Sequence, residues 1–175
     1  MLPAALLACA LNVSPVTLEA VVRVESGGDP LALHVNGVPV QPARGQDAKE
    51  VAEVAERFMR RGYSVDLGLM QLNSRNLPAL GLTVLQALDP CTNLRAGAAI
   101  LAADYAAAAQ TRGEGQAALL AALSAYNTGD FARGFRNGYV ARYVPVLAGH
   151  AAPAPSPVAS DSTVYVQEAP HVRVQ

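Results

Sequence analysis

Apolar residues recur at helical spacing between Ser14 and Asp29, and the stripe that they form ends on a carboxylate. Ser14 is a favourable N-cap, Pro15 suits the first helical position, and Gly27-Gly28 supplies a left-handed exit. A helix is therefore expected between these signals. Positions i, i+3, i+4 and i+7 of its core-facing stripe are Leu18, Val21, Val22 and Glu25.

The same periodicity predicts further helices along the chain. Their expected ranges are 47–62, 89–112, 116–126 and 139–147, the last partly broken by Pro145. Alternation of apolar and other residues up to Asn36-Gly37 predicts a small β-hairpin over residues 32–41, since Asn-Gly between apolar runs favours a tight turn.

A strand-like run around Gly68 introduces a dense group of polar side chains. A glycine inside such a run indicates that another group approaches its backbone closely. Amides and hydroxyls at this density suit a hydroxyl-rich ligand. The group consists of Gln71, Asn73, Ser74 and Asn76.

Composition favours one mainly α domain with a tail. Hydrophobic residues make up 51% of the 175 residues and charged residues 15%, and runs of alanine favour helix. We expect a mainly α (α+β) domain over 1–148 and a flexible Pro/Ala/Ser-rich tail over 149–175.

The net charge of −1 argues against nucleic acid or an anionic membrane as a partner. Residues 1–13 are apolar but lack a basic n-region and are too short to span a membrane, so neither an export signal nor a transmembrane segment is evident.

The chain contains two cysteines, Cys9 and Cys91. An even count permits a disulfide, and two buried free thiols are the alternative. Neither cysteine has a Cys or His partner at metal-ligand spacing, so we expect no metal and no cofactor.

Glu25 is the candidate catalytic group. Burial disfavours a charged carboxylate, and so does the last turn of a helix, where backbone carbonyls carry partial negative charge. A carboxyl group that keeps its proton can act as a general acid. The alternative is that Glu25 is simply a solvated residue at a helix end.

Five short motifs, taken together and in order, resemble a known family. They are Glu25-Ser26, Gly68-Leu69-Met70-Gln71, Asn93-Leu94, Ala125-Tyr126-Asn127 and Gly138-Tyr139-Val140. Over residues 9–147 the chain resembles soluble lytic transglycosylases with a lysozyme-like fold, in particular the group attached to type IV secretion and conjugation systems.

This resemblance implies an activity on peptidoglycan in the periplasm. Members of the family cleave the β-1,4 bond between N-acetylmuramic acid and N-acetylglucosamine with a single glutamate, here Glu25. The glutamate first acts as an acid and then as a base, and the muramic acid's own 6-hydroxyl closes a 1,6-anhydro ring. The expected partners are glycan strands and, through the tail, secretion-system subunits.

The resemblance also implies roles for individual residues. Tyr126 would orient Glu25, although a tyrosine at a helix end can also be a core residue. Asn93 is either a cleft amide or a helix cap, Tyr139 either a rim residue or a core residue, and Ser26 closes the helix end. Cys9 and Cys91 match cysteines of the group, which implies a disulfide. The remaining candidates for substrate binding are Gln71 at the acetamido groups, Asn73 on the cleft wall, Met70 on its floor, and Asn127.

The sequence departs from the broader family before Gly138, where Phe135, Arg136 and Asn137 replace an acidic residue that often aids substrate placement. Two other functions remain open. A hydrolytic muramidase would need a carboxylate that positions water, for which Asp66 is the candidate. An inactive peptidoglycan-binding module could instead recruit secretion subunits through the tail.

Overall fold

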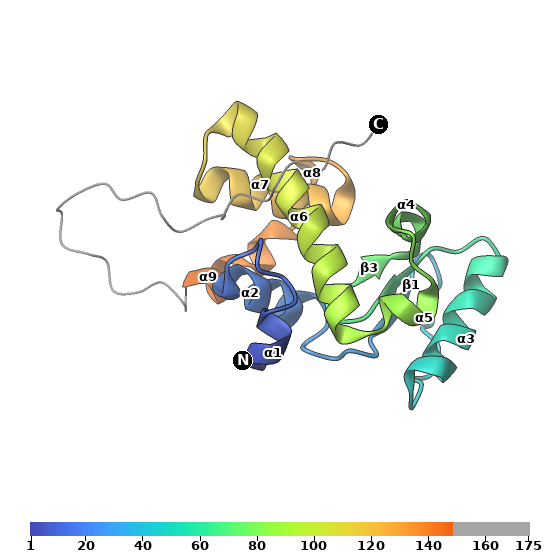
Figure 1. The fold of residues 1–175 in the computed structure, drawn as a ribbon. Helices are drawn as coiled ribbons and strands as arrows, with labels where there is room; N and C mark the ends of the chain where they lie inside the picture. Colours follow the sequence, from blue (N-terminus) through green and yellow to red (C-terminus); the bar gives the residue numbers. More distant parts are fainter. Residues whose placement is uncertain (149–175) are drawn as a thin grey trace. The chain divides into compact units, whose positions relative to one another are not determined.

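A computed structural model gives the structure of residues 1–148, and the predicted tail at 149–175 lies outside the described residues. The described chain is mainly helical with one small antiparallel sheet, which confirms the expected fold class (Figure 1). It divides into two compact units. Unit 1 contains residues 1–10 and 21–97, and unit 2 contains residues 11–20 together with the chain from 98 onward.

The sheet lies in unit 1 and consists of β1 (Leu33–Val35), β2 (Val65–Leu67) and β3 (Leu72–Asn73), in that order. Both strand pairs are antiparallel. One face of the sheet is apolar, whereas the other carries His34, Asp66 and Asn73 in one cross-strand row.

The predicted hairpin over residues 32–41 is wrong in its pairing. The first strand forms, but its partner is β2, and the hairpin of this sheet joins β2 to β3. The reason is visible at Val35, whose outer edge is occupied by the Gln41 side chain. The Gln41 carbonyl oxygen accepts the Val35 N–H at 2.7 Å, and the Gln41 amide nitrogen donates to the Val35 carbonyl at 2.9 Å. One side-chain amide therefore makes the bonds that a returning strand would have made.

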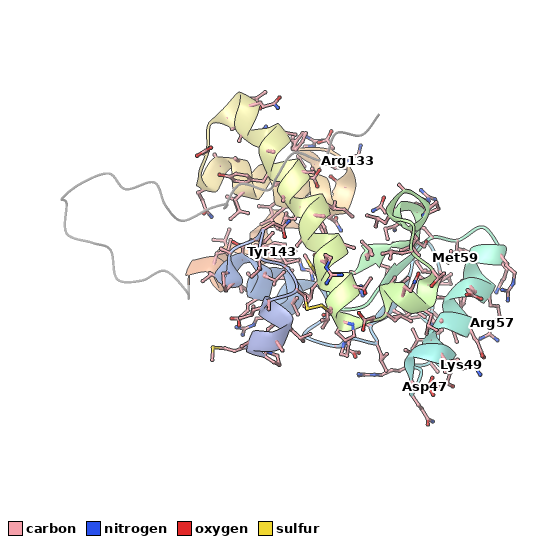
Figure 2. All side chains as sticks on the ribbon, in the orientation of Figure 1. Asp47, Lys49, Arg57, Met59, Arg133 and Tyr143 are labelled. Carbon is pink, nitrogen blue, oxygen red and sulfur yellow. A yellow bond between two sulfur atoms is a disulfide. The ribbon has the colours of Figure 1, made fainter. Side chains whose placement is uncertain are left out.

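Unit 1 also contains one long helix that packs on this sheet and several shorter ones. The longest is α3 (Ala48–Arg60), which confirms the predicted helix after Asp47; the Asp47 carboxylate accepts the Glu50 N–H at 2.8 Å as its N-cap. The shorter ones are α1 (Ala4–Leu7), η1 (Ser74–Asn76), α4 (Leu77–Leu80) and α5 (Val84–Ala87). Cys9 and Cys91 form the expected disulfide, which joins the segment after α1 to the start of α6 (Figure 2).

Two long helices contribute residues to both units. They are α2 (Pro15–Glu25) and α6 (Pro90–Arg112), and both confirm predicted helices. Unit 2 also contains α7 (Gln116–Thr128), which the sequence predicted two residues shorter, and α8 (Arg133–Arg136), which it did not predict. The predicted piece over 139–147 divides into η2 (Val140–Arg142) and α9 (Val144–Ala148). Pro145 lies in the first turn of α9, where a proline is tolerated.

Close packing of α7 against α8 depends on a glycine. The Gly134 N–H donates to the Ser124 hydroxyl at 2.8 Å, and that hydroxyl lies 2.6 Å from the Asp130 carbonyl oxygen, to which it donates. A Cβ atom on Gly134 would lie 2.8 Å from the Ser124 Cα, closer than real contacts allow. Both residues are buried, so the approach is part of the core of unit 2.

Candidate functional site

Glu25 is the last residue of α2, as the sequence predicts. The Ser14 hydroxyl accepts the Thr17 N–H at 3.2 Å, which caps the helix start. At the other end Gly27 and Gly28 take positive φ values of 66° and 89°, so the chain turns away directly after the carboxylate. Along the predicted stripe Leu18, Val21 and Val22 are buried and Glu25 is half-buried. The carboxyl group thus stands at the border between the apolar stripe and the solvent.

Ser26 connects this helix end to the turn that follows β2. Its hydroxyl lies 2.8 Å from the Leu69 carbonyl oxygen and 3.1 Å from the Val22 carbonyl oxygen, and it accepts the Gly28 N–H at 3.2 Å. The predicted structural role of Ser26 in closing the helix is confirmed. The bond to Leu69 was not predicted, because it joins residues that are 43 positions apart.

Asn93 holds the same turn from its other side. Its carbonyl oxygen accepts the Met70 N–H at 2.8 Å, and its amide nitrogen donates to the carbonyls of Leu67 at 2.8 Å and Ala87 at 2.6 Å. The Asn93 side chain is fully buried. Since both amide hydrogens and the oxygen bind backbone, Asn93 acts on the site by fixing residues 67–70. The cap of α6 is instead Asp89, whose carboxylate accepts the Thr92 N–H at 2.8 Å.

The turn between β2 and β3, residues 68–71, has an unusual backbone. Gly68 has a φ of 69°, and a Cβ atom there would lie 2.6 Å from the Asn93 amide nitrogen, which confirms the predicted close approach. Gln71 has a φ of 48°, a left-handed conformation that costs free energy for a residue with a side chain. The Gln71 amide nitrogen donates to the Gly68 carbonyl at 3.1 Å. No described residue donates a hydrogen bond to the Gln71 side-chain oxygen.

A row of amide and carboxylate groups lies on the polar face of the sheet. The two carboxylate oxygens of Asp66 accept hydrogen bonds from the side chains of Asn73 at 2.6 Å and Asn36 at 2.9 Å. The Asn73 side-chain oxygen accepts the Arg75 N–H at 3.0 Å. Asp66 is therefore held by amides on both oxygens.

The candidates in unit 2 fall into two environments. Tyr126 is half-buried and Asn127 exposed, both in the last turn of α7. Tyr139 is only 5% exposed, and its hydroxyl forms a 2.7 Å hydrogen bond with the Tyr143 hydroxyl. This burial supports the core alternative for Tyr139.

Each unit thus contains part of the predicted set of site residues. Unit 1 contains Glu25, Met70, Gln71, Asn73 and Asn93, and unit 2 contains Tyr126, Asn127 and Tyr139. Met70 is fully buried beneath the turn.

Among residues 1–148, three carboxyl groups have shifted pKa values. Hydrogen bonds from Thr92 hold the pKa of Asp89 below its usual value. The backbone N–H groups of Ala132 and Arg133 lower the pKa of Asp130, with a smaller effect of nearby arginines. Burial raises the pKa of Asp104 on α6.

The described part of the chain holds no cluster of three or more His, Cys, Asp or Glu side chains that could bind a metal ion. Within residues 1–148, no helix combines the length and the apolar character that crossing a membrane requires.

Comparison with known proteins places these residues in a family. The model of the transglycosylase SLT domain matches residues 5–143. The chain is 46% identical over 132 residues to Protein virB1 of Agrobacterium fabrum, covering 75% of this chain and 53% of that protein. It is 41% identical over 131 residues to the type IV secretion system protein virB1 of Brucella abortus biovar 1, covering 73% and 54% respectively.

The chain spans about half the length of these curated relatives. No solved structure matches it significantly. The family match covers the disulfide, the catalytic candidate, the 68–71 turn and the end of α7. The chain therefore belongs to the family of proteins with a transglycosylase SLT domain.

Proposed function

We propose that this chain is a lytic transglycosylase that cleaves the MurNAc-GlcNAc β-1,4 bond of peptidoglycan and forms 1,6-anhydro-MurNAc. The observation that carries the proposal is the hydrogen bond from Ser26 to Leu69. It ties the residue directly after Glu25 to the turn that carries Met70 and Gln71. An acid and an amide-bearing turn are thereby held in one unit, as recognition and protonation of an N-acetylated sugar require.

In the proposed reaction Glu25 alternates between acid and base. Its carboxyl group donates a proton to the glycosidic oxygen as the bond from the MurNAc C1 to that oxygen breaks. The substrate's N-acetyl group stabilises the positive charge that develops at C1. The Glu25 carboxylate then removes the proton of the MurNAc 6-hydroxyl, and this oxygen bonds to C1. The proton returns to Glu25, and no water is consumed.

The other site residues bind and orient substrate in this proposal. The Gln71 side-chain oxygen is left to accept a hydrogen bond from an acetamido N–H. Asn73 and Asn127 contribute polar groups of the substrate-binding set, and Met70 supports the turn from below. Tyr126 has the proposed role of orienting Glu25, which rests on its motif alone. Tyr139 acts through packing rather than by touching the sugar.

Asp66 is the candidate for the second carboxylate that a hydrolytic muramidase needs to position a water molecule. One hydrogen bond to each of its oxygens, from Asn36 and Asn73, fixes its orientation on the sheet surface. Each oxygen keeps a second lone pair, so the type of product separates transglycosylation from hydrolysis.

Mass spectrometry of the products released from purified sacculi tests the proposal. The wild-type chain should release 1,6-anhydro products, Glu25→Gln should release none, and Asp66→Asn should change the amount but not the type of product. Circular dichroism of each variant serves as the folding control. Reducing-end products, or an active Glu25→Gln, would contradict the mechanism.

We further propose that the enzyme opens the cell wall locally for a type IV secretion or conjugation apparatus in the periplasm. The Brucella abortus relative is named as a type IV secretion system protein, which supports the context, and the Cys9–Cys91 disulfide fits an oxidising compartment. Residues 149–175 are the proposed contact with secretion subunits. Deleting residues 150–175 should reduce conjugation while activity on sacculi is kept, whereas Glu25→Gln should reduce both. Unchanged conjugation after the deletion would reject the role of the tail.

A further inference from the structure

Unit 2 contains arginine and phenylalanine side chains on α8 and just before it, together with Arg112 of α6, and we call this set the α8 patch. The Arg112 guanidinium lies over the ring of Phe131 at 5.8 Å from its centroid. Arg133 and Arg136 are the first and last residues of α8, and their spacing of three positions places them on the same side of this single helical turn. Phe135, between them, is 49% exposed. The patch comprises Arg112, Phe131, Arg133, Phe135 and Arg136.

The guanidinium groups of the patch form no ion pair within the described chain, and their effect on the nearby Asp130 is a small lowering of its pKa. Over residues 1–148, no carboxylate lies within ion-pair distance of the guanidinium groups of Arg112, Arg133 or Arg136. The nearby acid Asp130 is used for capping, since one of its carboxylate oxygens accepts the N–H groups of Ala132 at 2.9 Å and Arg133 at 2.7 Å. Residues 112–142 contain four arginines and two acidic residues, a net charge of +2, whereas the whole chain has −1.

We propose that the α8 patch binds the carboxylates of peptidoglycan stem peptides, so that the enzyme recognises peptide-bearing glycan in preference to bare glycan. This inference rests on the proposed function, because the stem peptides belong to the same polymer. Guanidinium groups form paired hydrogen bonds with carboxylates, and an exposed phenylalanine can pack against alanyl methyl groups. The two neighbouring arginines of α8 fit a short acidic peptide, whereas a bilayer or a long polyanion is held by a larger basic surface.

Binding to two matched polymers tests the inference. The first is uncrosslinked glycan with its stem peptides, and the second is the same glycan after an amidase has removed the stems. The double variant Arg133→Gln/Arg136→Gln is compared with wild type in a sedimentation assay at low salt. Arg57→Gln/Arg60→Gln on α3 is the control, because these two arginines are also exposed and three positions apart, although Arg60 lies 3.8 Å from the Glu56 carboxylate.

The double variant should bind stem-bearing glycan about tenfold more weakly than wild type, the loss expected for two charge-assisted contacts at an exposed surface. Its affinity for stripped glycan should equal that of wild type, and the control should match wild type on both polymers. Added salt should shrink the difference. Equal losses on both polymers, no loss on either, or the same loss in the control would overturn the inference.

The same proteins distinguish this inference from the proposed function. Binding of glycan does not require that the reaction takes place. If wild type binds stem-bearing glycan more tightly than the double variant does but releases no anhydro products, the proposed reaction is rejected and the role of the α8 patch is supported. Anhydro products with equal binding by wild type and the double variant would support the reaction and reject the patch. Circular dichroism checks that the variants are folded, which is expected because the backbone N–H of Arg133, not its side chain, makes the cap with Asp130.

Discussion

Removing the Cys9–Cys91 disulfide should lower the free energy of unfolding substantially. The bond joins residues 82 positions apart. In the chain-entropy model a crosslink of that span restricts the unfolded chain by an amount equivalent to about 4.5 kcal/mol at 25 °C. A free energy of unfolding of about 5–15 kcal/mol is typical for a domain, so the double variant Cys9→Ala/Cys91→Ala should be folded but much less stable.

Urea denaturation followed by far-UV circular dichroism measures this loss. With a slope of about 2 kcal/mol per molar urea, the midpoint should fall by about 2 M. The thermal midpoint should fall by on the order of 10 °C. The slope should not decrease, because the chain without its crosslink exposes at least as much surface on unfolding.

Reduction provides the control. Wild type treated with a reductant should reach the stability of the double variant, and the double variant should not respond to the same reductant. A loss below about 1 kcal/mol in the variant would refute the reasoning, since the unfolded chain would then have to be compact without the crosslink. Activity on sacculi well below the thermal midpoint should be retained, because the hydrogen bonds of Asn93 do not involve the disulfide.

Three further predictions concern single positions. Asn93→Asp should destabilise by about 3 kcal/mol in urea denaturation, since it places an oxygen against two backbone carbonyls; the same change at the exposed Asn137 should cost little, and equal losses would contradict the assigned role. Gly134→Ala should lower stability by about 1–3 kcal/mol through overpacking against Ser124, and an unchanged thermal midpoint would show that α8 can shift. Asp89→Ala should cost about 1 kcal/mol at pH 7 through loss of the cap. The pKa of Asp89 is lowered in the folded state, so its contribution is present above the unfolded value and is lost as pH falls through the folded value. The urea midpoints of wild type and Asp89→Ala should therefore converge at a pH well below 3.8, and a constant difference would show that the charge is not responsible.

The sequence predicted the long elements and missed the pairing of the short ones for a physical reason. The helix from Ser14 to Gly27 is specified locally, because its cap, its stripe and its exit all lie within one stretch. The strand at 33–35 is also specified locally, but its partner lies 30 residues further on. A turn dipeptide such as Asn36-Gly37 reverses the chain but does not determine whether the residues after it form a strand. Here the Gln41 side chain hydrogen-bonds the backbone of Val35 in place of a strand, and no pattern in the sequence predicts that contact.

The candidate site shows the same limit. Periodicity placed Leu94 in the core, and Asn93 beside it is equally buried. A buried asparagine in a sequence gives no indication of which carbonyls it binds, since Leu67 is 26 positions away. The motif resemblance identified Asn93, but only the structure shows that its amide supports the turn from within. Asp66 likewise looked like a free carboxylate until its two amide partners, Asn36 and Asn73, were placed.

The support around residues 68–71 explains how a strained turn can persist without substrate. A left-handed φ at a residue such as Gln71 costs about 1–3 kcal/mol. Three hydrogen bonds between the side chains of Asn93 and Ser26 and the backbone at 67–70, each contributing about 0.5–1.5 kcal/mol, offset that cost. Because these partners are side chains of the folded protein, the turn is already shaped without a ligand. In the proposed reaction, substrate binding then need not supply the free energy of ordering it, and more of the binding energy remains for reaching the transition state.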